Sequence, residues 1–164
     1  MVEWMLSHII EMEFEKAVGK NHHEDGKAMH IGFDLHCENK TDQYRVAHMY
    51  LFAPGNYVYV ALQEERIDAK GKRHVGKMEM LCYHDSCWRD SIQSYIFKHS
   101  AEMGTFSAFD KFKSWYDVLT LSQEEIDYLR KLEKWRYDAA IRSDPAQYPA
   151  ANPFDERGIW AKRK

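Results

Sequence analysis

The chain has 164 residues, of which 45% are hydrophobic and 14% aromatic, and its formal net charge is −3. This length is enough for one well-buried core and too short for two comfortable ones. We therefore expect a single α+β domain over residues 1–143. A C-terminal extension over residues 144–164 holds three of the four prolines, so we expect it to be irregular.

The charge and composition also argue against several classes of protein. A small negative net charge does not suit a protein that binds nucleic acid through a bulk positive field. No run of about 20 apolar residues is present, so we expect no membrane span and a soluble chain without a leader peptide. Three cysteines without a disulfide spacing favour a reducing compartment, and we expect a cytoplasmic location.

The first half of the chain alternates between apolar and polar residues in runs that are rich in β-branched and aromatic side chains, a pattern typical of strands. Short loops with Gly and Asn separate the runs, and short links favour an antiparallel meander. The expected strands cover residues 7–18, 28–37, 44–52, 57–67 and 73–83.

Folding each hairpin about the middle of its loop predicts a register, in which Phe33 pairs with His48, Tyr50 with Ala61, and Ala61 with Met80. This register gives the sheet one core face and one mixed face. The expected core face carries Ile10, Met12, Phe14, Ile31, Phe33, Leu35, Val46, Tyr50, Phe52, Tyr57, Tyr59, Ala61, Met78 and Met80. The expected mixed face carries His30, Asp34, His36, Arg45, Met49, Leu51, Val58, Val60, Leu62, Glu64, Arg66, Lys77, Glu79 and Leu81.

The period changes to that of helices after residue 85. Trp88, Ile92, Tyr95, His99 and Met103 form one helical stripe, and a shorter helical pattern runs from Phe109 to Leu119. Ser122 and Glu125 then form a capping box, which predicts a helix to about Ser143. We therefore expect an α+β fold, in which a bent five-stranded antiparallel sheet or partial barrel packs on two to three C-terminal helices.

One end of the mixed face is apolar, and an exposed apolar patch on a soluble chain usually marks a contact surface. We expect this patch to bind a protein partner or a second copy of the chain, or to be covered by the C-terminal extension. Its expected residues are Leu51, Val58, Val60, Leu62, Leu81 and His30.

Two residue clusters offer chemistry. Cys82, His84 and Cys87, with His22 from the first loop, have the side chains of a zinc site, although their spacing departs from the usual paired-cysteine pattern. The alternative, which we favour, is that these cysteines pack as small buried hydrophobes and that no cofactor is bound.

The second cluster is His36, Asp34 and Arg45, in which Arg45 is expected beside His36. A histidine near a carboxylate can act as a general base, and the arginine can stabilise an anion. The alternative is a solvated sheet face with cross-strand charge pairs. His48 interrupts an apolar stripe, and we expect it to be buried and hydrogen-bonded to a tyrosine hydroxyl or a backbone carbonyl.

These patterns contain no complete catalytic motif, so we favour a non-catalytic cytoplasmic binding protein, a regulator or inhibitor of a larger macromolecule. This protein would contact its partner through the mixed sheet face or the C-terminal tail. One alternative is a histidine-based or metal-dependent hydrolase acting on a phosphorylated or nucleotide-like small molecule. The other is a carrier that holds a small ligand between sheet and helices.

Overall fold

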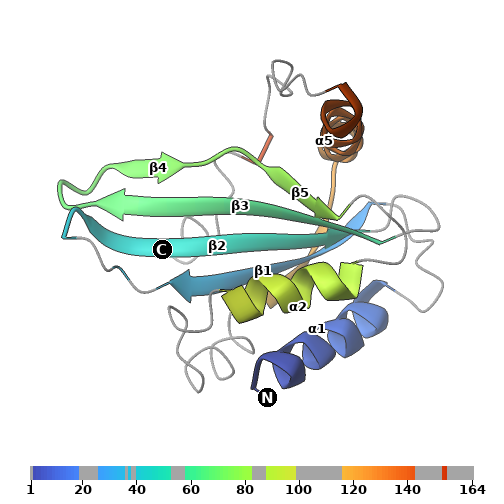
Figure 1. Cartoon of the computed structure of the whole chain (residues 1–164), viewed down its shortest axis with the longest axis horizontal. Helices are drawn as coiled ribbons and strands as arrows, with labels where there is room; N and C mark the ends of the chain where they lie inside the picture. The colour runs from blue at the N-terminus through green and yellow to red at the C-terminus, as the bar shows by residue number, and fades with distance from the viewer. Residues whose placement is uncertain are drawn as a thin grey trace.

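The computed structural model describes residues 2–18, 26–35, 37, 40–52, 58–82, 88–98, 116–142 and 153–154. In these residues the fold is α+β, as the sequence predicts, with an open antiparallel sheet and helices packed on it (Figure 1). The helices are α1 (Val2–Val18), α2 (Trp88–Lys98) and α5 (Gln123–Arg142). The strands are β1 (Lys27–Leu35), β2 (Asp42–Phe52), β3 (Tyr59–Asp68), β4 (Arg73–Val75), β5 (Glu79–Cys82) and β6 (Tyr116–Thr120).

The strands follow the order β4-β3-β2-β1-β6, and β5 pairs with β3 beyond the end of β4. Figure 1 shows α1 and α2 lying next to each other on one side of the sheet, while α5 lies close to β5. No helix in the described ranges combines the length and apolar character needed to cross a bilayer.

The expected strand over residues 7–18 is wrong, because this segment belongs to helix α1. Its Glu, Met, Leu and Lys residues favour a helix, and the spacing of four residues between Ile10 and Phe14 also fits one face of a helix. Ile10 and Phe14, four residues apart, are fully buried, whereas Met12 is 44% exposed. A strand would have placed all three on one face.

Two further elements differ from expectation. Of the predicted helical pattern over residues 109–119, the structure describes only the end, where Tyr116–Thr120 forms strand β6 instead and Leu119 pairs with Ala28 of β1. The expected strand over residues 73–83 is divided into β4 and β5 near Gly76. In contrast, the stripe of α2 is confirmed by buried Trp88, Ile92 and Tyr95, while His99 and Met103 lie outside the described residues.

The capping box that opens α5 is confirmed in both directions. The backbone N–H of Glu125 donates to Ser122 Oγ at 3.2 Å, and the backbone N–H of Ser122 donates to Glu125 Oε1 at 3.0 Å. Two of the N–H groups near the helix start are thereby satisfied.

The pairing of β2 with β3 and the pairing of Ala61 with Met80 are as predicted, but Phe33 pairs with Ala47 and not with His48. This shift of one residue moves all of β1 to the opposite face relative to β2. The reason is that both faces of the sheet are covered. Both sets of alternate positions on β2 are therefore apolar, and the pattern alone does not define the register.

One core lies between the sheet and helices α1 and α2. The ring of Phe14 on α1 contacts Trp88 on α2, with centroids 5.5 Å apart. The sheet contributes buried Met29, Ile31, Phe33, Leu35, Ala47, Met49, Leu51, Val58, Val60 and Leu62 to this core.

The second core lies on the other face of the sheet, beneath α5. Phe154 of the C-terminal extension is fully buried there and packs against Tyr50, with centroids 5.0 Å apart. The other members include Ala28, Phe52, Ala61, Met78, Leu119, Leu121, Ile126, Tyr128, Leu129 and Leu132.

Candidate functional site

The expected apolar contact patch is not exposed. Leu51, Val58, Val60 and Leu62 are at most 7% exposed and belong to the core under α1 and α2. The prediction of exposure is wrong because α1, expected as a strand, is a helix that covers this face together with α2. His30 is also fully buried, on the opposite face.

Leu81 is the member of this set that stays partly exposed. It lines an open hollow of about 370 Å³ against α2, together with Asp90, Ser91, Ser94, Tyr95 and Lys98.

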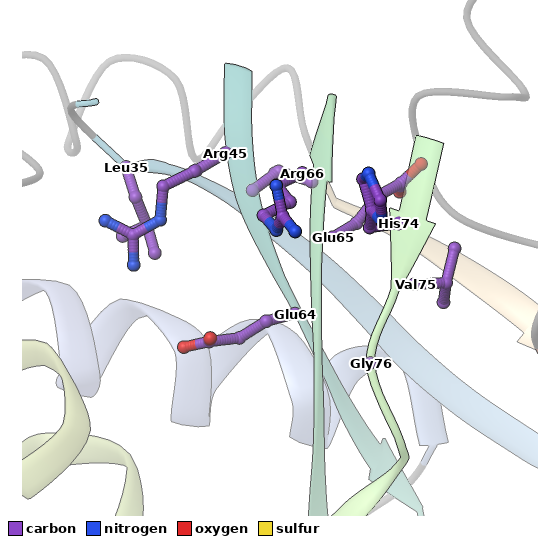
Figure 2. Close-up of a pocket in the computed structure, with 9 residues that line it drawn as sticks. Leu35, Arg45, Glu64, Glu65, Arg66, His74, Val75 and Gly76 are labelled. Carbon is purple, nitrogen blue, oxygen red and sulfur yellow. The ribbon is translucent and has the colours of Figure 1, made fainter. Parts of the chain in front are cut away.

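A pocket of about 220 Å³ lies at the charged end of the sheet face that α1 and α2 cover elsewhere (Figure 2). Four of its residues form one row across β1 to β4, because Leu35 pairs with Arg45, Arg45 with Arg66, and Arg66 with His74. Figure 2 shows Arg45 and Glu64 extending to the same side of β2 and β3. Val46, Glu65, Val75 and Gly76 complete the lining.

Two arginines directly opposite each other on neighbouring strands repel, since cross-strand partners are about 5 Å apart at Cβ. Asp42 offsets part of this cost, because Arg66 Nη1 donates to Asp42 Oδ1 at 2.7 Å. The side chain of Asp42 is only 5% exposed, whereas that of Arg66 is 44% exposed. The pair therefore anchors Arg66 and leaves much of its guanidinium facing solvent.

The hairpin between β3 and β4 fixes His74 at the end of the row. His74 Nε2 lies 2.9 Å from Asp68 Oδ2, and the backbone N–H groups of Lys70 and Lys72 donate to Asp68 Oδ1, each at 2.9 Å. The hydrogen bond from His74 and those from the two amides lower the pKa of the Asp68 carboxyl. Gly71 supplies the positive φ of 82° that this turn requires.

A buried chain of polar groups runs through the opposite face of the same strands. His30 Nε2 lies 3.0 Å from His48 Nδ1, and His48 Nε2 lies 2.7 Å from Glu65 Oε2. The other oxygen of Glu65 accepts a hydrogen bond from Arg73 Nε. His30, His48 and Glu65 are at most 2% exposed. The chain therefore joins β1, β2, β3 and β4 within the protein.

Glu65 is the ionised member of this chain. Burial alone raises the pKa of its carboxyl, but the hydrogen bonds and positive charge of His48 and Arg73 outweigh burial and lower the pKa. Because an ionised carboxylate only accepts hydrogen bonds, His48 Nε2 is the donor to Glu65. The ring of Tyr50 stacks on His30, with centroids 4.6 Å apart and an interplanar angle of 6°.

The second predicted cluster is only partly described. Arg45 lines the pocket and pairs with Leu35, so the expectation that it pairs with His36 is wrong by one residue. Asp34 pairs with Val46, while His36 lies outside the described residues. The register therefore does not support the predicted grouping of Asp34 with Arg45, since neighbouring positions of a strand alternate between faces.

The predicted zinc site also falls largely outside the described part of the chain. His22, His84 and Cys87 are not described, and Cys82 is the last residue of β5. Within the described ranges, no group of three or more His, Cys, Asp or Glu residues is placed to hold a metal ion.

His48 is buried and hydrogen-bonded, as predicted, but its partners are His30 and Glu65 instead of a tyrosine hydroxyl or a carbonyl. The sequence reasoning missed Glu65 and Arg73. A signal was present, because the correctly predicted pairing of β2 with β3 places Gln63 opposite His48. Glu65 lies two positions from Gln63 along β3 and therefore on the same face as His48.

In comparisons with known proteins, no protein-family model, no curated protein and no solved structure matches this chain.

Proposed function

We propose that this chain is a non-catalytic binding protein that holds an acidic segment of a partner macromolecule at the row Arg45, Arg66 and His74. The observation that carries the proposal is the direct opposition of Arg45 and Arg66 across β2 and β3 at an open pocket. Holding two like charges side by side costs stability, and a bound carboxylate would offset that repulsion.

The size of the pocket favours a macromolecular partner over a small ligand. Its volume of about 220 Å³ lies below the roughly 300–1,000 Å³ of most small-molecule sites. A hollow of this size suits one or two side chains of a partner that contacts the surrounding surface. Buried side chains of the sheet and helices form a core on each face of the sheet in the described residues, which argues against the carrier alternative.

The charged groups around the row determine where an incoming carboxylate is attracted and where it is repelled. Both oxygens of Glu65 are engaged by His48 and Arg73, and Asp42 is engaged by Arg66. Glu64 is the exposed acid of the lining, and it would repel an incoming carboxylate while Arg45 and Arg66 attract it. The three cysteines of the sequence favour the cytoplasm as the place of action.

The test measures binding of a fluorescently labelled deca-glutamate peptide by anisotropy at low salt. Arg66→Gln should weaken binding about tenfold, because one charge-assisted hydrogen bond is worth about 1.5–3 kcal/mol. Glu64→Gln should strengthen binding. Arg130→Gln makes the same charge change on an exposed position of α5 and should leave binding near the wild-type value.

Equal weakening by Arg66→Gln and Arg130→Gln would contradict the proposal, because it would show attraction by net charge alone. Competition by inorganic phosphate separates the alternatives further. If millimolar phosphate displaces the peptide completely, the row recognises a small free anion and not an acidic segment.

A further inference from the structure

The two buried histidines share a single hydrogen bond, and this limits the protons that the folded chain can hold. His30 Nε2 and His48 Nδ1 are 3.0 Å apart, and one hydrogen atom occupies the line between them. Whichever nitrogen donates, the other must present its lone pair. At least one of the two rings is therefore neutral whenever this contact is intact.

The two arrangements of the chain differ by one proton. In the first, both rings are neutral, His48 donates from Nε2 to Glu65, and its Nδ1 accepts from His30 Nε2. In the second, one ring is an imidazolium: either His48, which donates from both nitrogens to Glu65 and to His30, or His30, which donates from Nε2 to Nδ1 of a neutral His48. A third arrangement with two imidazolium rings would bring two N–H groups together at 3.0 Å, with neither able to accept.

We propose that the His30–His48 pair is a buried one-proton site that makes the folded state sensitive to acid. The unfolded chain has no such limit, because its two histidines take up one proton each below about pH 6.5. When both histidines of the unfolded chain are protonated, the unfolded pair therefore holds at least one proton more than the folded pair. Since the unfolded state binds more protons, stability falls as the pH falls.

The surroundings of the pair do not lift this limit. Glu65 of β3 contacts His48 and is itself contacted by Arg73 of β4, and Tyr50 of β2 stacks on His30. Asp117 of β6 is the register partner of His30. On the same face, Asp34 occupies a later position of β1, and α5 contributes Tyr128 to the core beneath the sheet. A carboxylate beside the pair would stabilise one imidazolium, but it would add no acceptor between the two rings.

The pair is a closed site and not a catalytic one. Both rings are 0% exposed, and neither His30 nor His48 lines a pocket described above. A proton reaches it only by local opening of the strands. The proposal therefore concerns the stability of the fold and is independent of the ligand at the arginine row.

The direct test counts protons in the intact wild-type protein. Side-chain nitrogen shifts of histidines labelled with ¹⁵N would be followed from about pH 8 to about pH 5 under conditions where the protein stays folded. We expect His30 and His48 together to hold at most one proton. Two separate, complete protonations in the folded protein would overturn the proposal.

A second test uses the pH dependence of urea unfolding. His30→Gln keeps a donor near the position of Nε2, and its amide oxygen can accept a hydrogen bond from a charged His48. His48 is then the one histidine left at this site, and it can hold one proton in the folded variant as in the unfolded variant. For each unit by which the pH falls below about 6, the unfolding constant of the wild type should rise about tenfold more than that of the variant. His8→Gln leaves the pair intact and should keep the wild-type slope.

Equal slopes for the wild type and His30→Gln would contradict the proposal. If the variant does not fold, the proton count in the wild type still decides, because that measurement needs no substitution.

Discussion

The ring of Phe14 on α1 lies against Trp88 on α2, at a tilt of 55° and a centroid distance of 5.5 Å. This contact joins α1, which precedes β1, to α2, which follows β5. Arg89 strengthens the same junction, since its guanidinium lies over the Trp88 ring and its Nε donates to Glu11 on α1.

Phe14→Ala should lower the free energy of unfolding by about 3–5 kcal/mol, because it removes a fully buried aromatic ring from this junction. Met12→Ala is the matched control, since Met12 is 44% exposed and its loss should cost less than about 1 kcal/mol. Urea denaturation followed by far-UV circular dichroism measures both. Similar losses for the two variants would indicate that residues 10, 12 and 14 share a face, as in a strand.

Glu65→Gln should destabilise the fold by about 2–3 kcal/mol at neutral pH, since it removes the charge that Arg73 and His48 contact inside the protein. Glu64→Gln is the control, because Glu64 is the neighbour of Glu65 in the chain and its side chain is exposed. Urea unfolding of the two variants beside the wild type gives the difference. A loss at Glu65 no greater than that at Glu64 would show that the buried contacts contribute little.

The same carboxyl predicts a second acid-sensitive range, below that of the histidines. The folded pKa of Glu65 is lowered, so its contribution is fully present above the ordinary glutamate value of about 4.3. It is lost as the pH falls through the lower folded value, because the unfolded state then binds the proton more readily. Wild-type stability should therefore fall more steeply below about pH 4.3 than that of Glu65→Gln. Parallel curves in this range would rule out a lowered pKa.

Ser122→Ala should cost about 1 kcal/mol, since it removes the acceptor for the backbone N–H of Glu125 at the start of α5. Ser94→Ala on the exposed side of α2 is the control and should be neutral or slightly stabilising, because alanine favours a helix interior. Thermal unfolding of both variants tests the difference. A neutral Ser122→Ala would mean that water replaces the cap without loss.

Gly26→Ala should destabilise the protein by about 1–2 kcal/mol, because Gly26 has a φ of +86° just before β1. Its carbonyl also accepts from the backbone N–H of Leu121, so the turn links β1 to the start of α5. Gly26→Asn should recover part of the loss, since asparagine tolerates this conformation better. The order Gly, Asn, Ala in melting temperature is the expected result.

The sequence predicted those elements in which local pattern and tertiary environment agree. The stripe of Trp88 and Ile92 and the capping box at Ser122 belong to helices whose spacing has one interpretation. The pairing of Tyr50 with Ala61 followed from a short hairpin. These features depend on neighbours in the chain, which a single sequence shows directly.

The errors have a common physical origin, which is that cover on both faces of the sheet removes the contrast between them. Ile10 and Phe14 fit both a strand and a helix, and Tyr50 and Leu51 on β2 are both buried on opposite faces. With β1 displaced by one residue, His30 was assigned to the apolar patch and not beside His48. The chain from His30 to Arg73 requires three correct pairings, so one error concealed it.

The break between β4 and β5 changes the phase of the outer strand. Val75 pairs with Glu65 and Met80 with Ala61, positions of β3 that share a face, although residues 75 and 80 differ in parity. The extra residue near Gly76 lets Met78 be buried under α5 while Lys77 stays exposed. If residues 75–80 instead continued in a single alternation without this extra residue being accommodated, Lys77 would be directed into the apolar interior and Met78 onto the opposite face of the sheet.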